Sequence, residues 1–168
     1  MEDRAGGRVR STGLLASMGG RTFEIGVLGP LELAVRGRSV DPGTRKQRLL
    51  LLRLVAGRGR PVAHEQLVEA LWGDRPPGAP EVSLRSYVSN LRKLLEPDRP
   101  RWASSALSAL GDSYALTLED GALDADRLAE DLREAQAAPH PELRLARAVR
   151  ALRRWRGTPF TDADGAPF

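Results

Sequence analysis

The sequence predicts an α+β fold, in which an antiparallel sheet, three helices and a second hairpin precede a pair of helices. Two short alternating runs, FEIGVL and LELAV, flank Gly29-Pro30, which predicts two strands joined by a turn. Three segments between residues 44 and 97 instead place apolar residues three or four positions apart, the spacing of amphipathic helices. Glycine and proline separate these segments, so the elements can be taken in order.

The first part predicts a meander and two helices. A short third strand at residues 38–40 follows the two alternating runs. Thr44 is the expected N-cap of a helix that runs to about Ala56 and ends at Gly57. The stretch HEQLVEALWGD predicts a second helix that ends at Gly73, because the RPPGAP loop after it is too rich in proline to be helical.

The stretch EVSLRSYVSNLRKLLEP at residues 81–97 predicts a third helix with two different faces. Leu84, Val88, Leu91 and Leu95 fall at helical spacing and would face a core. The rest of the cylinder is polar and basic and carries Arg85, Ser89, Asn90, Arg92 and Lys93. The run SALSALGDSYAL that follows alternates loosely around Gly111-Asp112, as a hairpin would.

From about Asp120 the pattern changes to two amphipathic helices. Asp124 is the expected cap of DADRLAEDLREAQAA. ELRLARAVRALRRW predicts the second helix, and its apolar side comprises Leu145, Val149, Leu152 and Trp155. Trp155 is expected to lie in a core. A single helical hairpin leaves its apolar face uncovered. That face must pack on the first domain, pair with another chain or belong to a longer helical domain.

The predicted organisation is a flexible leader at residues 1–20, a mixed domain at 21–119 and a partial helical domain at 120–168. The absence of cysteine removes thiolate catalysis, disulfide frameworks and the common zinc sites. No Walker phosphate loop, G-x-S-x-G or H-E-x-x-H motif occurs, so neither an enzyme nor a cofactor or metal site is predicted. The longest apolar run, LLLL, is too short for a bilayer, so we expect a cytoplasmic protein without a membrane partner.

Positive charge is concentrated near the start of the first helix. The net charge is only +4, yet residues 44–60 hold six basic side chains and no acidic one. A stretch of one sign suits a polyanion. A solvated arginine-rich face explains the same stretch equally well, so charge alone does not choose between the two.

The order of three helices and a hairpin is one in which a third helix can enter the major groove of DNA. Arginine can bind guanine with two hydrogen bonds, asparagine can do the same for adenine, and serine suits a phosphate or a base. The polar side of residues 81–97 therefore predicts a DNA interface. The alternative is a protein-interaction module, in which the helical hairpin binds a partner and the basic helices are merely solvated.

Four blocks of the sequence resemble an OmpR-type winged-helix domain, and more narrowly the DNA-binding region of the Streptomyces antibiotic regulatory proteins, the SARP family. They are FEIGVLGPLEL, TRKQRLLLLRLV, EQLVEALWGDRPP and LRSYVSNLRKLLEP, in the family's order. The later segments DADRLAEDLREAQAA and ARAVRALRRWRGTPF resemble the beginning of the bacterial transcriptional activation domain of that family. The likeness covers roughly residues 22–160.

The resemblance implies a transcriptional activator that binds direct repeats in promoters, often of antibiotic biosynthetic clusters. The implied partners are double-stranded DNA, RNA polymerase and a second copy of the chain on the DNA, and the implied location is the nucleoid. By position, contacts to bases and phosphates would fall to Arg85, Ser89, Asn90, Arg92 and Lys93, and contacts to the backbone to Arg45, Lys46 and Arg48. Relatives of this fold meet polymerase subunits through the loop that here reads Gly73, Asp74, Arg75, Pro76 and Pro77.

Two departures limit what the resemblance implies. The hairpin keeps Gly111 and Tyr114 of the family pattern but has Asp112 and no nearby arginine, so minor-groove contact by the hairpin is not implied. The helical part amounts to about one hairpin, where the family has several. A DNA binder that does not activate transcription is therefore the alternative to an activator.

Overall fold

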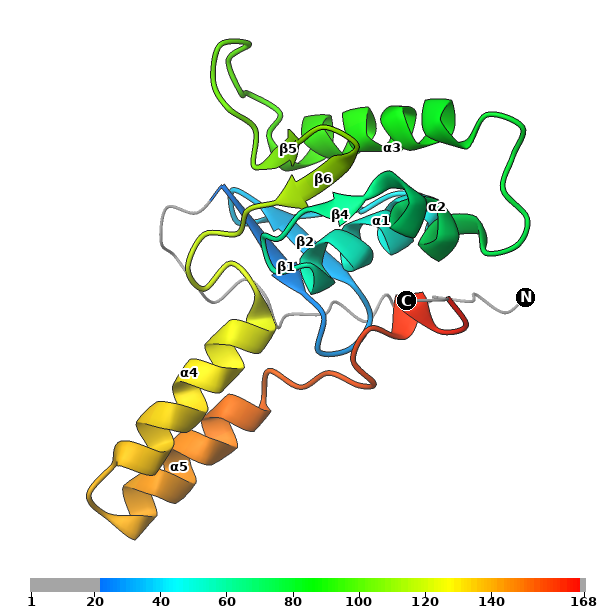
Figure 1. Ribbon diagram of the computed structural model, residues 1–168. Coiled ribbons are helices and arrows are strands. Elements are labelled where there is room, and N and C mark those ends of the chain that lie inside the picture. Colours follow the sequence, from blue (N-terminus) through cyan, green and yellow to red (C-terminus); the bar gives the residue numbers. More distant parts are fainter. Residues whose placement is uncertain (1–21, 167–168) are drawn as a thin grey trace, which may run out of the picture.

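The first sheet is a three-stranded antiparallel meander, as the alternating runs predict. The computed structural model describes residues 22–166, so the predicted leader at residues 1–20 lies outside the described residues (Figure 1). Strands β1 (Phe23–Gly26), β2 (Glu32–Val35) and β3 (Arg38–Val40) pair in that order. The β2–β3 turn places both Arg36 and Gly37 at positive φ, which is the geometry of a tight hairpin turn.

Three helices follow, with ends close to those predicted. Helix α1 (Arg45–Ala56) begins at a capping box, in which Thr44 N donates to Gln47 Oε1 at 2.9 Å and Thr44 Oγ1 accepts from Gln47 N. Strand β4 (Val62–Ala63) leads into α2 (His64–Trp72). Helix α3 (Pro80–Leu95) begins with proline at its first position, where the missing N–H removes no helical hydrogen bond.

The second sheet brings a hairpin alongside α3. Strands β5 (Leu107–Ala109) and β6 (Ser113–Leu116) form that hairpin, and β4 pairs with β6 to give the order β4-β6-β5. In Figure 1 α3 runs along one edge of the molecule, with the hairpin between α3 and the first sheet. The predicted order of sheet, three helices and hairpin, which defines an OmpR-type winged helix, is confirmed.

A single apolar cluster joins both sheets to the three helices. From α3 it takes Leu84, Val88, Leu91 and Leu95, each at most 1% exposed. Full burial of such a side chain stabilises the fold by about 1.5–3 kcal/mol. Helix α3 is therefore held by four anchors on one side, which fixes the direction in which its other side faces.

The C-terminal part is an antiparallel pair of helices, α4 (Asp124–Ala137) and α5 (Pro141–Leu152), that extends away from the rest (Figure 1). Asp124 was expected to cap α4, and this expectation is wrong. The N-cap residue is Leu123, and the carboxylate of Asp124 instead accepts the N–H groups of Val27 and Leu28 at 2.8 and 3.1 Å. Those two N–H groups follow the end of β1 and would otherwise be buried without a partner.

The chain after α5 runs back along the β1–β2 turn to the start of α1. Arg156 N donates to Leu28 O at 2.6 Å, and Phe160 N donates to Val27 O at 2.9 Å. Gly29 permits this approach, because a Cβ there would lie 2.9 Å from the Cβ of Arg156 and its φ is +148°. The segment ends in the short helix η1 (Thr161–Ala163), whose Ala163 joins the main apolar cluster.

The expectation that Trp155 lies in a core is wrong, since it is 51% exposed, and Leu145, Val149 and Leu152 are exposed with it. Helix α5 meets α4 through its alanine side, where Ala151 is fully buried. The orientation is fixed by arginines of α5: Arg147 donates to Glu134 O at 3.1 Å, and Arg144 donates to Ala138 O at 2.7 Å. The larger apolar residues of α5 are thereby turned outward.

Within residues 22–166, no helix combines the length and the apolar character needed to cross a membrane.

Candidate nucleic-acid interface

The outward face of α3 carries four of the predicted DNA-binding residues together. Arg85, Ser89, Asn90 and Lys93 are all exposed, and they follow one another at steps of one to four residues on the side opposite the buried leucines. Between residues 82 and 95 the helix has no acidic residue. This outward face is therefore polar and positively charged, as contact with a polyanion requires.

The same face continues toward the start of α3 with Val82, which is 64% exposed, and with the exposed Ser86. Residues 82, 85, 86, 89, 90 and 93 form one helical stripe. Val82 was not among the residues singled out from the sequence. Its signal is its register, since it shares the stripe with Arg85 and Ser89 and not the buried row that begins at Leu84.

Arg92 has a different position from the other four. Its side chain is half-buried, and Nε donates to the main-chain oxygen of Leu107 in β5 at 2.8 Å. The contact ties the last turn of α3 to the first strand of the hairpin. Arg92 therefore faces the hairpin, and its guanidinium holds the hairpin against α3.

The basic residues at the start of α1 make contacts within the protein. Lys46 Nζ donates to the main-chain oxygen of Leu71 and lies 5.8 Å from the centre of the Trp72 ring. Burial lowers the pKa of Lys46, and the neighbouring charge of Arg45 lowers the pKa further. Lys46 is thus held against the end of α2.

Arg48 and Arg45 contact the C-terminal segment. Arg48 pairs with Asp162 of η1 at 3.0 Å, and its Nε donates to Gly43 O at the same distance. The exposed Arg45 reaches Asp164 O at 3.4 Å. In Figure 1 η1 and α3 lie on opposite sides of α1 and α2. The structure therefore does not bring the basic start of α1 together with the outward face of α3.

The predicted polymerase-contact loop joins α2 to α3. Asp74, Arg75, Pro76 and Pro77 are exposed, whereas Gly73 is half-buried at φ +56°. The loop begins at a fixed point, because the Trp72 ring stacks on Tyr87 of α3 with ring centres 6.2 Å apart. None of these four exposed residues belongs to the apolar cluster.

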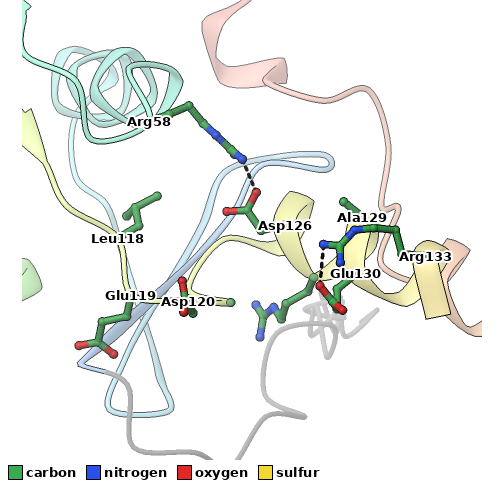
Figure 2. A pocket seen from close by; sticks show the side chains of 10 residues that line it. Arg58, Leu118, Glu119, Asp120, Asp126, Ala129, Glu130 and Arg133 are labelled. Atoms are coloured by element: carbon green, nitrogen blue, oxygen red, sulfur yellow. Dashed lines mark hydrogen bonds and ion pairs between the residues drawn. The ribbon is translucent and has the colours of Figure 1, made fainter.

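An open hollow of about 680 Å³ lies elsewhere, where the turn after α1 meets the start of α4 (Figure 2). Charged residues of both signs line it and pair with one another, as Arg58 does with Asp126 at 2.5 Å and Arg133 with Glu130 at 2.6 Å. In the part of the chain that the structure describes, no group of three His, Cys, Asp or Glu side chains is placed to hold a metal ion. The hollow is a junction between the two parts of the molecule.

The fold and the outward face of α3 define the class of domain, an OmpR-type winged helix. A family model described as "Transcriptional regulatory protein, C terminal" matches residues 39–105. The structure of Mycobacterium tuberculosis EmbR in complex with a low affinity phosphopeptide superposes with a TM-score of 0.75 at 38% identity, covering 86% of this chain and 39% of that chain.

Curated relatives are similar over most of this chain. "Transcriptional regulatory protein EmbR" of Mycobacterium tuberculosis is 38% identical over 88% of this chain, and "Regulatory protein AfsR" of Streptomyces coelicolor is 36% identical over 85%. "Regulatory protein DnrI" of Streptomyces peucetius is 30% identical over 83%. Over the residues that match, the chain is similar to transcriptional regulators of the SARP family. It spans 39% of the EmbR sequence, 14% of AfsR and 54% of DnrI.

Proposed function

We propose that this protein binds double-stranded DNA sequence-specifically and regulates transcription. The observation that carries the proposal is the outward face of α3, on which Arg85, Ser89, Asn90 and Lys93 are exposed together while four apolar anchors hold the other side. The major groove of B-DNA admits an α-helix, and its floor presents hydrogen-bonding groups that differ between base pairs. An anchored helix with a polar outward face fits that groove.

The side chains divide into roles by their chemistry. Arg85 and Asn90 suit base edges, because each can form two hydrogen bonds to one purine. Lys93 near the end of α3 suits a phosphate, and Ser89 suits a phosphate or a base. Arg92 acts as a positioning residue, because its Nε donates a hydrogen bond to Leu107 O. Of the basic residues of α1, only Arg45 is exposed, and its contact with the C-terminal segment at Asp164 O makes it the weakest candidate for contact with the same duplex.

The test of this proposal is selection of bound duplexes from a random pool with the full chain. We expect an enriched sequence, and we expect the logarithm of its affinity to fall linearly with the logarithm of salt concentration, with a slope that reports the phosphates neutralised. A pool without enrichment, together with binding that is insensitive to salt, would overturn the proposal.

The finer parts of the proposal concern what happens at a promoter. We propose activation at direct repeats spaced near one helical turn, with two copies side by side on the DNA and the loop at residues 73–77 facing RNA polymerase. The exposure of Asp74 and Arg75 supports the last point. Transcription in vitro from a promoter carrying the enriched sequence tests it: Asp74→Ala with Arg75→Ala should reduce transcription while DNA affinity stays unchanged.

A second candidate function is partner binding through α5. It is favoured by one observation, the outward row of Leu145, Val149, Leu152 and Trp155, each at least 46% exposed. An apolar contact of this kind would respond little to salt, unlike DNA binding.

We propose no catalytic role, a cytoplasmic location at the nucleoid, and a division of the chain near residue 120 into a DNA-binding and a helical domain.

A further inference from the structure

Trp102 lies in the loop between α3 and β5 and is 88% exposed. Tryptophan is a residue type that folded proteins mostly bury, and tryptophan and arginine are among the residues that contribute most of the binding energy at interfaces. Arg101, the preceding residue, is also exposed. The loop at residues 96–106, called here the Trp102 loop, therefore displays an indole and a guanidinium side by side in the chain.

The Trp102 loop is held in place by hydrogen bonds at both ends. The carboxylate of Glu96 accepts from Ala106 N at 3.0 Å and from Ser105 Oγ, which joins the end of α3 to the start of β5. The guanidinium of Arg99 donates to Ala103 O, within the turn that carries Trp102. The indole is therefore displayed by an ordered loop, so little conformational entropy opposes its contact with a partner.

A further tie connects the Trp102 loop to the first sheet. Asp98 pairs with Arg36, which lies in the β2–β3 turn. The carboxylates of both Glu96 and Asp98 are thus engaged within the protein, and Arg101 is the exposed charge next to Trp102. The tip of the loop presents a positive charge and an aromatic ring to whatever lies above it.

The direction of the Trp102 loop matches the direction of the proposed DNA. Figure 1 shows the loop rising from the C-terminal end of α3 on the side away from α1 and beyond the level of α3 itself. The outward face of α3 points to that same side, because the residues that contact α1 and α2 are its buried ones. A duplex lying over α3 would therefore meet the loop at one end of the helix.

We propose that the Trp102 loop is a second DNA contact, which grips the sugar-phosphate backbone next to the groove that α3 enters. This inference rests on the proposed function. The indole of Trp102 packs against deoxyribose, its Nε1–H donates to a phosphate oxygen, and Arg101 pairs with a neighbouring phosphate. The loop extends the footprint past the end of α3 and adds affinity without reading bases.

The test compares two duplexes that share the enriched sequence. The longer one continues for about one helical turn past the end of α3, and the shorter one stops there. For Trp102→Ala we expect about tenfold weaker binding to the longer duplex and no change on the shorter one. Trp155→Ala is the matched control, because Trp155 is also an exposed tryptophan but lies just past the end of α5, and it should change neither affinity.

A direct readout follows Trp102 itself. In a chain with Trp72→Phe and Trp155→Phe, Trp102 is the single tryptophan, and its quenching by acrylamide should fall several-fold when the longer duplex is bound. Unchanged quenching, or equal affinities of wild type and Trp102→Ala on the longer duplex, would overturn the loop contact while leaving α3 binding intact. Failure of the wild type to bind even the shorter duplex would overturn both the proposed function and this inference.

Discussion

The guanidinium of Arg92 on α3 donates Nε to the main-chain oxygen of Leu107 on β5 at 2.8 Å, which joins the proposed recognition helix to the hairpin beside it. This single contact changes what an arginine on that helix is expected to do. A guanidinium engaged with the protein's own backbone orients a neighbouring element, whereas a free one on the outward face is available to DNA. Arg92 and Arg85, seven residues apart, therefore have different expected roles.

Replacement of Arg92 should affect the fold more than sequence preference. We expect Arg92→Ala to lower the free energy of unfolding by about 1 kcal/mol, the typical net value of one hydrogen bond, and to speed amide hydrogen exchange in β5. Binding to enriched and random duplexes should weaken by the same factor. A loss confined to the enriched duplex, with hydrogen exchange in β5 unchanged, would instead assign base contact to Arg92.

Replacement of Arg85 should affect sequence preference more than the fold. Arg85 is exposed on the outward face of α3, so we expect Arg85→Ala to leave the thermal midpoint nearly unchanged. Affinity for the enriched duplex should fall by about 1–3 kcal/mol, and substitution of one base pair should no longer matter. Competition binding against single-base variants of the duplex measures this, and preserved discrimination at every base pair would contradict it.

The contribution of phosphate contacts is measured by the salt dependence of binding. We expect Lys93→Ala to reduce the slope of log affinity against log salt by about 1, since Lys93 is exposed on the outward face of α3. Arg45→Ala is the matched comparison, because Arg45 is also exposed but lies at the start of α1, by the C-terminal segment. Its slope should equal that of the wild type. A reduced slope for Arg45→Ala would return the start of α1 to the DNA interface.

Asp124 should be one of the main polar attachments of the helical part to the first sheet, together with the Arg127–Glu24 pair. The carboxylate of Asp124 accepts two backbone N–H groups and pairs with Arg156 at 3.0 Å, with both side chains largely buried. Loss of one member of such a buried pair typically destabilises a protein by about 3–5 kcal/mol, and we expect this of Asp124→Leu. The control is Asp126→Leu, whose more exposed pair with Arg58 should contribute about 0–1 kcal/mol. Urea denaturation measures both, and equal losses would contradict the assignment.

The sequence allowed much of the fold to be predicted, because local signals and tertiary packing agree there. The capping box at Thr44 and the buried row of α3 are examples, as each follows from residues within one helix. The two wrong expectations, for Asp124 and Trp155, have a common cause. A capping residue and an apolar stripe describe one helix alone, whereas Asp124 binds the backbone just after β1 and Arg147 of α5 binds the backbone of α4.

The candidate site was predictable in part for the same reason. The outward direction of Arg85, Ser89, Asn90 and Lys93 follows from the helical register that buries Leu84 and Val88. The contacts that Lys46 and Arg48 make within the protein could not be predicted from the sequence, because their partners, Leu71 and Asp162, lie 25 and 114 residues further along the chain. Periodicity within one segment holds no information about partners at such separations.

The most direct test of the central claim uses the absence of cysteine from the sequence. A DNA-cleaving chelate attached to the single thiol of Ser89→Cys, on the outward face of α3, should cut the enriched duplex at one position inside the selected sequence. The same chelate on Gln136→Cys, exposed near the end of α4, should leave that position intact. Cutting from Gln136→Cys with none from Ser89→Cys would contradict the assignment of α3 as the helix that enters the groove.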